Sequence, residues 1–276
     1  MNLDSTISLA VHINSLKDKL NKAKITPLSY DFSVIKIQEK NWKSVPIIIN
    51  SFNRKKYLEE QVSYLKSRGY NNIYIIDNKS SYLPLLEFYK SENLRVFYLS
   101  ENVGYLSLWE TGVFDLFLDS YYVYTDSDVV PSEAVPDDFI EKFAGILNDY
   151  IFLDKVGFSL ELDDLSNKLS ATADIKKHEM NFWMYDIDLR FYFAPIDTTF
   201  ALYRPNVKGG WWLKSGRTFR PYIAKHLPWY EDKKRLSEED IFYYENIKKK
   251  THWSKSVGKY FILNKIKSFL GKLIIK

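Results

Sequence analysis

Four short apolar runs, each followed by polar residues, constrain the fold of this 276-residue chain more than any other feature of its sequence. The runs cover residues 46–50, 73–77, 95–99 and 121–125, and segments with helical spacing separate them. Buried parallel strands are nearly continuous apolar runs, because both faces of such a sheet are covered. Strands that alternate with helices are typical of a doubly wound parallel sheet. The sequence therefore predicts an α/β fold.

The remaining elements are predicted from helical spacing and from capping residues. Asn53 is expected to cap the helix that follows the first strand, and Gly69 is expected to end it. Ser237 and Asp240 form a capping-box pattern at the start of a helix predicted at 237–246. Other helices are predicted at 83–89, from 104 to about 118 and at 137–150, and other strands at 156–160 and, as one or two pieces, within 191–203.

Composition excludes several kinds of protein. The chain has no cysteine, which rules out disulfide scaffolds, thiolate zinc sites and cysteine nucleophiles. Hydrophobic residues make up 46% and charged residues 27%, as in globular domains and not in disordered chains. The net charge of +4 conceals an asymmetry, since residues 248–276 hold nine lysines and no acidic residue. The rest of the chain is therefore mildly acidic.

Three regions are expected: an N-terminal helical extension (1–44), a central domain (45–247) and a basic amphipathic C-terminal helix (248–276). The C-terminal segment has the pattern of an interfacial helix with flanking lysines that would contact an anionic membrane surface, although a terminal helix packed on the body or on a partner subunit has the same pattern. Residues 1–10 have no basic start and no apolar core, so we expect no export, and no run reaches the roughly 20 apolar residues that a membrane span needs. We expect a cytoplasmic protein held peripherally at the inner face of the cytoplasmic membrane. No nucleic-acid recognition module accompanies the basic tail.

Polar residues follow all four predicted strands. In doubly wound sheets, ligands bind beyond the carboxyl ends of the strands, so these side chains should converge in a ligand crevice. The fourth strand leads into Asp126-Ser127-Asp128, whose two carboxylates could bind one hard cation such as Mg²⁺ or Mn²⁺ and leave room for phosphate oxygens. A solvated acidic turn is the alternative interpretation of this short motif.

Four segments, 47–54, 74–80, 101–104 and 124–128, resemble in order and spacing the motifs of GT-A-fold glycosyltransferases. The resemblance is strongest to the family 2 type, which acts in bacterial surface-polysaccharide synthesis. It implies a Rossmann-like nucleotide-diphospho-sugar transferase fold with a mixed central sheet flanked by helices. The chain departs from the family in having about 45 residues before its first strand.

The same resemblance assigns roles to individual residues. Asp77 would receive the ring N–H of the base, Asp126 would contact ribose or metal, and Asp128 would bind the metal that bridges the diphosphate. A late histidine serves as an extra metal ligand in some of these enzymes, and His226 or His252 could do so here; a packed loop histidine is the alternative. The residues assigned to the nucleotide are Asn50, Ser51, Phe52, Asn53, Arg54, Asp77, Asn78, Asn102, Gly104, Asp126 and Ser127. Asn53, Asn78 and Ser80 could equally cap helices and form turns.

The activity implied is metal-dependent transfer of a hexosyl group from a nucleotide-sugar, expected to be a UDP-sugar, to a saccharide or lipid-linked acceptor, with inversion. Inversion needs a carboxylate to deprotonate the acceptor hydroxyl. By order in the resembled family, Glu239 or Asp240 fits this role, although helix capping also favours acidic residues there. Asp197 is the rival, as base or as acceptor contact, and the pair 163–164 is a third option. The sequence leaves the choice open.

Four aromatic residues late in the sequence have two interpretations. They either stack on acceptor sugars or are packed inside the protein: Trp211, Trp212, Trp229 and Tyr230.

Two other protein classes are alternatives to a glycosyltransferase. A sugar-1-phosphate nucleotidyltransferase would need a glycine-rich basic loop after the first strand, and residues 51–54 contain no glycine. A non-catalytic, membrane-associated glycan-binding or scaffold protein on a degenerate transferase fold is the other alternative. The intact Asp77, Asp126 and Asp128 argue against such decay.

Overall fold

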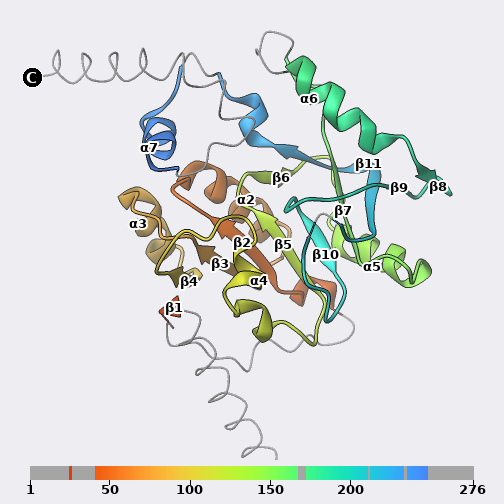
Figure 1. The fold of residues 1–276 in the computed structure, drawn as a ribbon, viewed down its shortest axis with the longest axis horizontal. Helices are drawn as coiled ribbons and strands as arrows, with labels where there is room; N and C mark the ends of the chain where they lie inside the picture. Colours follow the sequence, from red (N-terminus) through yellow and green to blue (C-terminus); the bar gives the residue numbers. More distant parts are fainter. Residues whose placement is uncertain (1–24, 27–40, 167–171, 211, 233–234, 248–276) are drawn as a thin grey trace, which may run out of the picture.

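The structure is a computed structural model that describes residues 25–26, 41–166, 172–210, 212–232 and 235–247 (Figure 1). Most of the helical extension expected over 1–44 and the C-terminal helix expected over 248–276, together with His252 and Trp211, lie outside the described residues. Within the described residues, no helix combines the length and the apolar character needed to cross a bilayer.

A single mixed sheet organises the described part of the chain. Four neighbouring strands, in the order β4-β3-β2-β5, are parallel. The sheet continues through β10, which is antiparallel to both β5 and β7, and then through β11, β9 and β8. The strands are β1 (Ile25–Thr26), β2 (Ile47–Ser51), β3 (Ile73–Asp77), β4 (Arg95–Leu99), β5 (Tyr122–Asp126), β6 (Val129–Pro131), β7 (Lys155–Leu160), β8 (Asp186–Ile187), β9 (Phe191–Phe193), β10 (Ala201–Tyr203) and β11 (Ser215–His226).

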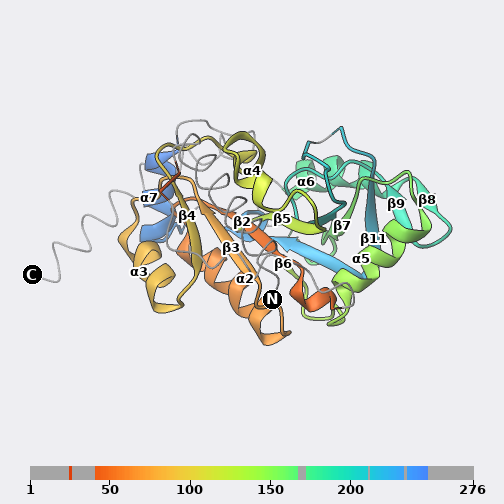
Figure 2. The ribbon, with the colours of Figure 1, turned by 90° about the horizontal axis from the view of Figure 1, so that it is seen from below.

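Helices cover both faces of this sheet, as Figure 2 shows for α2, α3 and α5 on one face and α4 on the other. Alternate residues of β2 enter two separate cores: Ile47 and Ile49 pack with the first group of helices, and Ile48 packs with α4 and η3. This double burial explains why the strands are continuous apolar runs. The helices are η2 (Trp42–Ser44), α2 (Lys55–Ser67), α3 (Leu83–Ser91), α4 (Ser107–Glu110), η3 (Val113–Leu116), α5 (Phe139–Asp149), α6 (Thr172–Glu179), η4 (Met180–Trp183), η5 (Leu227–Tyr230) and α7 (Glu238–Asn246).

The predicted fold class, a mixed α/β sheet flanked by helices, is confirmed. The four strands of the first half, the helices α2, α3, α5 and α7, and the separation of β9 from β10 match the sequence predictions. Gly69 has φ +82°, and the amides of Gly69 and Tyr70 donate to the carbonyls of Lys66 and Leu65, which ends α2 as expected. The capping box between Ser237 and Asp240 is present.

Two predictions about local structure were wrong, and one strand was missed. The helix expected from 104 to 118 is two short pieces, α4 and η3, because Gly112 between them adopts a left-handed conformation with φ +78°. Asn53 does not cap α2, whose N-cap is Arg54; the Asn53 side chain instead accepts hydrogen bonds from the amides of Ser81 and Tyr82, next to the start of α3. The longest strand, β11, was not predicted.

The C-terminal part of the described chain returns to the carboxyl edge of the parallel strands. Here α7 lies beside α3 (Figure 1), and aromatic rings join them: Tyr82 contacts Phe242 with centroids 5.1 Å apart, and Phe52 after β2 contacts Tyr243 at 6.2 Å. Ligands of doubly wound sheets bind at this edge. Helix α7 therefore covers part of the expected crevice.

Candidate functional site

A chain of hydrogen bonds joins the polar residues at the ends of the parallel strands. Asn50 at the end of β2 donates to Asp126 Oδ1 at the end of β5 (3.0 Å) and accepts a hydrogen bond from Asn78, which follows β3. Asn78 also donates to the Gly104 carbonyl (3.1 Å), and Asn102 Oδ1 accepts from the Gly104 amide (2.9 Å). All four predicted strand ends therefore meet in one place.

Asp77 lies at the same edge and is almost completely buried. Its register partner in β2 is Ser51, next to Asn50, which pairs with Asp126. Both carboxylate oxygens of Asp77 accept hydrogen bonds from the Ser80 amide (3.0 and 3.1 Å). Burial raises the pKa of Asp77 to about 6, against the opposing effect of these hydrogen bonds. In this structure the carboxylate therefore stabilises the turn after β3.

Asp126 is held from both sides of β5. Asn50 donates to one of its carboxylate oxygens and the Thr198 hydroxyl to the other, while the Asp126 amide donates to the Thr198 carbonyl (2.9 Å). Burial, and next the charge of Asp128, raise the pKa of Asp126 to about 8. The ionised carboxylates of Asp126 and Asp128 repel each other, so a nearby positive charge would favour the state in which both are ionised.

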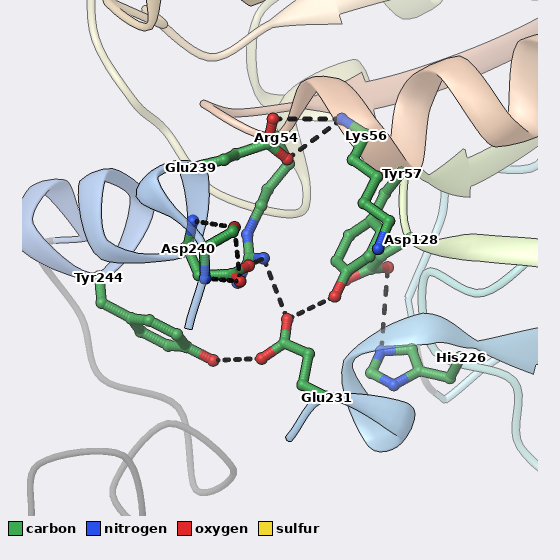
Figure 3. Close-up of polar contacts among 10 residues, drawn as sticks. Arg54, Lys56, Tyr57, Asp128, His226, Glu231, Glu239, Asp240 and Tyr244 are labelled. Carbon is green, nitrogen blue, oxygen red and sulfur yellow. Dashed lines mark hydrogen bonds and ion pairs between the residues drawn. The ribbon is translucent and has the colours of Figure 1, made fainter. Parts of the chain in front are cut away.

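Asp128 faces His226, as Figure 3 shows, and their Oδ1 and Nε2 atoms are 3.8 Å apart. This separation is too long for a hydrogen bond. Asp128 Oδ1 and His226 Nδ1 are both buried and have no hydrogen-bond partner within the described residues. The backbone fixes the arrangement, because His226 pairs with Val129 across β6 and β11 and the Leu227 amide donates to the Asp128 carbonyl (2.8 Å).

This pair fits a divalent cation. Two ligands that each lie about 2.1 Å from one ion are separated by at most about 4.2 Å, and the observed 3.8 Å satisfies that limit. The unpartnered carboxylate oxygen is the type of ligand that Mg²⁺ or Mn²⁺ prefers. No third His, Asp or Glu completes a metal cluster in the described part of the chain. An ion held here would take its other ligands from water or from substrate oxygens.

Arg54, which was expected to border the nucleotide, is only 5% exposed and pairs with two carboxylates of the C-terminal segment. Its guanidinium contacts Glu231 at 3.0 Å and also Asp240 (Figure 3). Glu231 accepts further hydrogen bonds from the hydroxyls of Tyr57 and Tyr244. This group of residues, which we name the Arg54 cluster (Arg54, Tyr57, Glu231, Asp240 and Tyr244), ties α7 to the start of α2.

Glu239 and Asp240, the candidate bases inferred from motif order in the resembled family, both accept hydrogen bonds from other residues. Glu239 accepts from the Lys56 amide at the N-terminus of α2, at 3.1 and 3.3 Å, and burial raises its pKa. Asp240 accepts from Arg54, and from the amide and hydroxyl of Ser237 in the capping box. Both residues therefore bind other parts of the protein in this structure.

Asp197 has a different environment. It is exposed, immediately precedes Thr198, and its carboxylate has no hydrogen bond or ion pair within the described residues. The third pair of candidate bases also forms ion pairs: Asp163 with Arg220, and Asp164 with Lys225. Of the candidate bases, Asp197 alone presents a carboxylate that is not already bound to a described group.

The remaining predicted residues divide into two groups. Ser127 is buried and its amide donates to the Asn50 carbonyl (3.0 Å), so it belongs to the strand-end network. Among the late aromatic residues, Trp229 is buried against His226 and the Tyr230 hydroxyl donates to Asp164, whereas Trp212 is 64% exposed. Only Trp212 keeps a broad surface for a ligand among the described members of this set.

Sequence reasoning missed several groups that shape the site. Thr198, Glu231 and Lys155 bind residues 40 to 180 positions away, and nothing local marks those partners. A single signal existed for Lys155, a lysine directly before a run predicted to be a buried strand. Charged residues at such positions need polar partners inside the protein.

No family model matches the chain, and no curated protein matches it. Two similar solved structures are of glucosyl-3-phosphoglycerate synthase from Mycobacterium tuberculosis, one with phosphoglyceric acid (TM-score 0.39, 10% identity) and one with Mn²⁺ and UDP-glucose (0.38, 11%). Each match covers 65% of this chain, and 63% and 62% of those chains. A third is a protein from Bacillus anthracis, described as a glucose-1-phosphate thymidylyltransferase in complex with a sucrose (0.34, 13%, 79% of this chain and 82% of that one). Likeness at these TM-scores supports no argument, so function is inferred from the geometry of the site.

Proposed function

We propose that this protein is a metal-dependent glycosyltransferase that moves a sugar from a nucleotide-sugar to a saccharide or lipid-linked acceptor. The observation that carries the proposal is the pair Asp128 and His226 at the edge where four parallel strand ends converge. Asp128 Oδ1 is buried without a hydrogen-bond partner in the described residues and lies 3.8 Å from His226 Nε2. Departure of a nucleoside diphosphate needs positive charge beside its phosphates, and a divalent cation supplies that charge when bound. Asp128 and His226 would hold the ion, with Asp126 behind them.

The strand-end network would hold the donor. Asn50, Asn78 and Asn102 carry amide groups that suit the hydroxyls and the base of a nucleotide. The hydrogen bonds that they make to one another, to Asp126 and to the Gly104 backbone arrange them before a ligand arrives, which reduces the cost of binding. We keep UDP as the nucleotide to test first, because the expected role of Asp77 is to accept a ring N–H.

Asp197 is the base that we favour. In inverting transfer, the acceptor oxygen bonds to the anomeric carbon as the bond to the diphosphate oxygen breaks. The diphosphate leaves with the bonding electrons, and the carboxylate takes the acceptor proton. Asp197 is exposed beside Thr198, whose hydroxyl binds Asp126, whereas Glu239 and Asp240 are bound to α2 and Arg54.

The wider role also remains a proposal. The motifs of the sequence favour the family 2 type, an inverting hexosyltransferase of surface-polysaccharide synthesis in bacteria. The basic segment 248–276 favours peripheral contact with an anionic membrane surface, which would bring a lipid-linked acceptor close. A non-catalytic glycan-binding protein on the same fold is the competing function, and Asp128 and His226 argue against it.

A nucleotide screen tests the proposal directly. We expect thermal stabilisation by UDP, or by one of GDP, CMP and dTDP, only when Mn²⁺ is present. The reason is that phosphate oxygens of the nucleotide would complete the coordination of the ion. Stabilisation of about 2.7 kcal/mol is expected at a ligand concentration 100 times its Kd. If none of the four nucleotides stabilises the protein with Mn²⁺, the transferase proposal is wrong.

The choice of base has its own test. With the nucleotide-sugar identified by the screen, Asp197→Asn should lower turnover by roughly 10²–10⁴-fold and leave Mn²⁺-dependent nucleotide binding intact. Glu239→Gln is the matched control, since the amide oxygen still accepts the Lys56 hydrogen bond, and it should retain most turnover. The reverse pattern, a slow Glu239→Gln and an active Asp197→Asn, would assign the base to α7.

A further inference from the structure

Lys155, the first residue of β7, is completely buried, with 0% of its surface exposed. Its ammonium donates to the Ile196 carbonyl at 2.7 Å, and to the Gly210 carbonyl and the Tyr203 hydroxyl at 3.2 Å each. The Asp197 carbonyl lies at 3.4 Å. These partners are all neutral oxygens, and they use the three protons that a lysine ammonium carries.

These bonds fix the two segments that flank β10, residues 194–200 before it and 204–214 after it. Neither segment contains a helix or strand in the described residues. A second buried cation assists, because Arg217 Nε donates to the Pro195 carbonyl at 2.8 Å while its guanidinium pairs with Glu179. Three consecutive carbonyls, of Pro195, Ile196 and Asp197, therefore face two buried cations.

Burying a charged ammonium inside a protein core costs free energy. Burial lowers the pKa of Lys155 to about 7, which measures the disadvantage of keeping its charge inside. A methionine of similar length would fill the space without that disadvantage. What the lysine adds over methionine is polar attachment of the two segments, because methionine cannot donate hydrogen bonds.

The attached segments carry two exposed groups that could contact a ligand. Asp197 presents its carboxylate, and Trp212 presents an indole that is 64% exposed. That ring lies against Gly210, where an added Cβ would approach the indole to 2.3 Å. Because one nitrogen atom contacts the carbonyls of both Asp197 and Gly210, the two segments lie side by side.

We propose that Lys155 is a positioning residue that sets Asp197 and Trp212 as the two walls of a saccharide-acceptor subsite. A sugar ring would lie on the indole of Trp212 and direct a hydroxyl to the Asp197 carboxylate. This inference rests on the proposed transferase function. Misplacement of a reacting group by about 1 Å is enough to lower turnover roughly 10²-fold, so a residue that touches no substrate controls the rate.

A double-mutant cycle tests the coupling. Lys155→Met should lower the turnover of the nucleotide-sugar found by the screen by roughly 10²-fold and leave the Kd for UDP and Mn²⁺ unchanged. In the Asp197→Asn background, Lys155→Met should have no further effect, because the group that it positions is already removed. Multiplicative effects of the two substitutions would overturn the proposal. Lys225→Met, at a half-buried lysine paired with Asp164, is the control and should keep full turnover.

Amide hydrogen exchange tests the same idea without any activity. Lys155→Met should speed exchange in residues 194–199 and 206–210 while β5 and β7 exchange at the wild-type rate. Unchanged exchange in these segments, or faster exchange throughout the domain, would show that Lys155 does not position them specifically. If the wild-type protein binds no nucleotide but the local effect is present, the transferase function fails and the attachment by Lys155 stands.

Discussion

Replacing Asp128 by alanine is expected to abolish the Mn²⁺-dependent binding of a nucleoside diphosphate. Asp128 Oδ1 is buried without a hydrogen-bond partner in the described residues and faces His226 Nε2 at 3.8 Å, so the loss of Asp128 removes half of the protein ligands proposed for the ion. Loss of an outer-shell partner typically weakens metal binding 10–100-fold, and a direct ligand should cost more than about 100-fold. Titration calorimetry with UDP in Mn²⁺ and in EDTA measures the effect.

The same substitution should not destabilise the metal-free protein. Asp128 contributes to the raised pKa of Asp126, and no described group binds its Oδ1, so alanine removes repulsion without breaking a hydrogen bond of that atom. We expect an unfolding midpoint in EDTA equal to or above that of the wild type. Asp163→Ala, which removes a carboxylate that is 82% exposed, is the control and should keep metal-dependent binding. Unchanged binding in Asp128→Ala would remove the assigned metal site.

The first half of the fold was predictable because its signals are local. Each strand from β2 to β5 is a short apolar run, and burial on both faces produces such a run whatever the distant sequence is. Once parallel neighbours are accepted, their carboxyl ends share one edge, so the meeting of Asn50, Asn78 and Asp126 follows from topology. The pairing of Asp128 with His226 needed the family resemblance as well, since 97 residues separate them in the chain.

The second half depends on partners that local patterns do not reveal. The strand β11 contains Arg217, Arg220 and Pro221, which lower its apparent strand character. In the fold it pairs with β6, β7 and β9, and the buried charge of Arg217 is compensated by Glu179. The helix expected after Gly104 failed for the opposite reason: its apolar spacing is helical, but Gly112 takes a left-handed conformation and divides it. Local sequence patterns likewise do not predict that Glu239 binds the Lys56 amide of α2 and that Asp240 pairs with Arg54.

Removing the charge of Arg54 should have the largest effect on stability. Arg54→Met leaves the carboxylates of Glu231 and Asp240 without their cation in a mostly buried cluster. Breaking a buried ion pair from one side typically costs about 3–5 kcal/mol, because the remaining charge stays uncompensated. We expect urea unfolding of the variant to show a loss of this size, and the rings of Tyr57, Tyr243 and Tyr244 around the guanidinium add to it.

Two further variants decide whether uncompensated charge is the cause. Arg220→Met breaks ion pairs with Glu161 and Asp163, but its side chain is 44% exposed, so the loss should stay within about 1 kcal/mol. Adding Glu231→Gln and Asp240→Asn to Arg54→Met removes the stranded carboxylates and should restore much of the lost stability. If the triple variant is no more stable than Arg54→Met alone, the cluster stabilises the protein by packing of the arginine side chain and not by charge. In that outcome α7 is held to the domain mainly by its aromatic contacts with Phe52 and Tyr82.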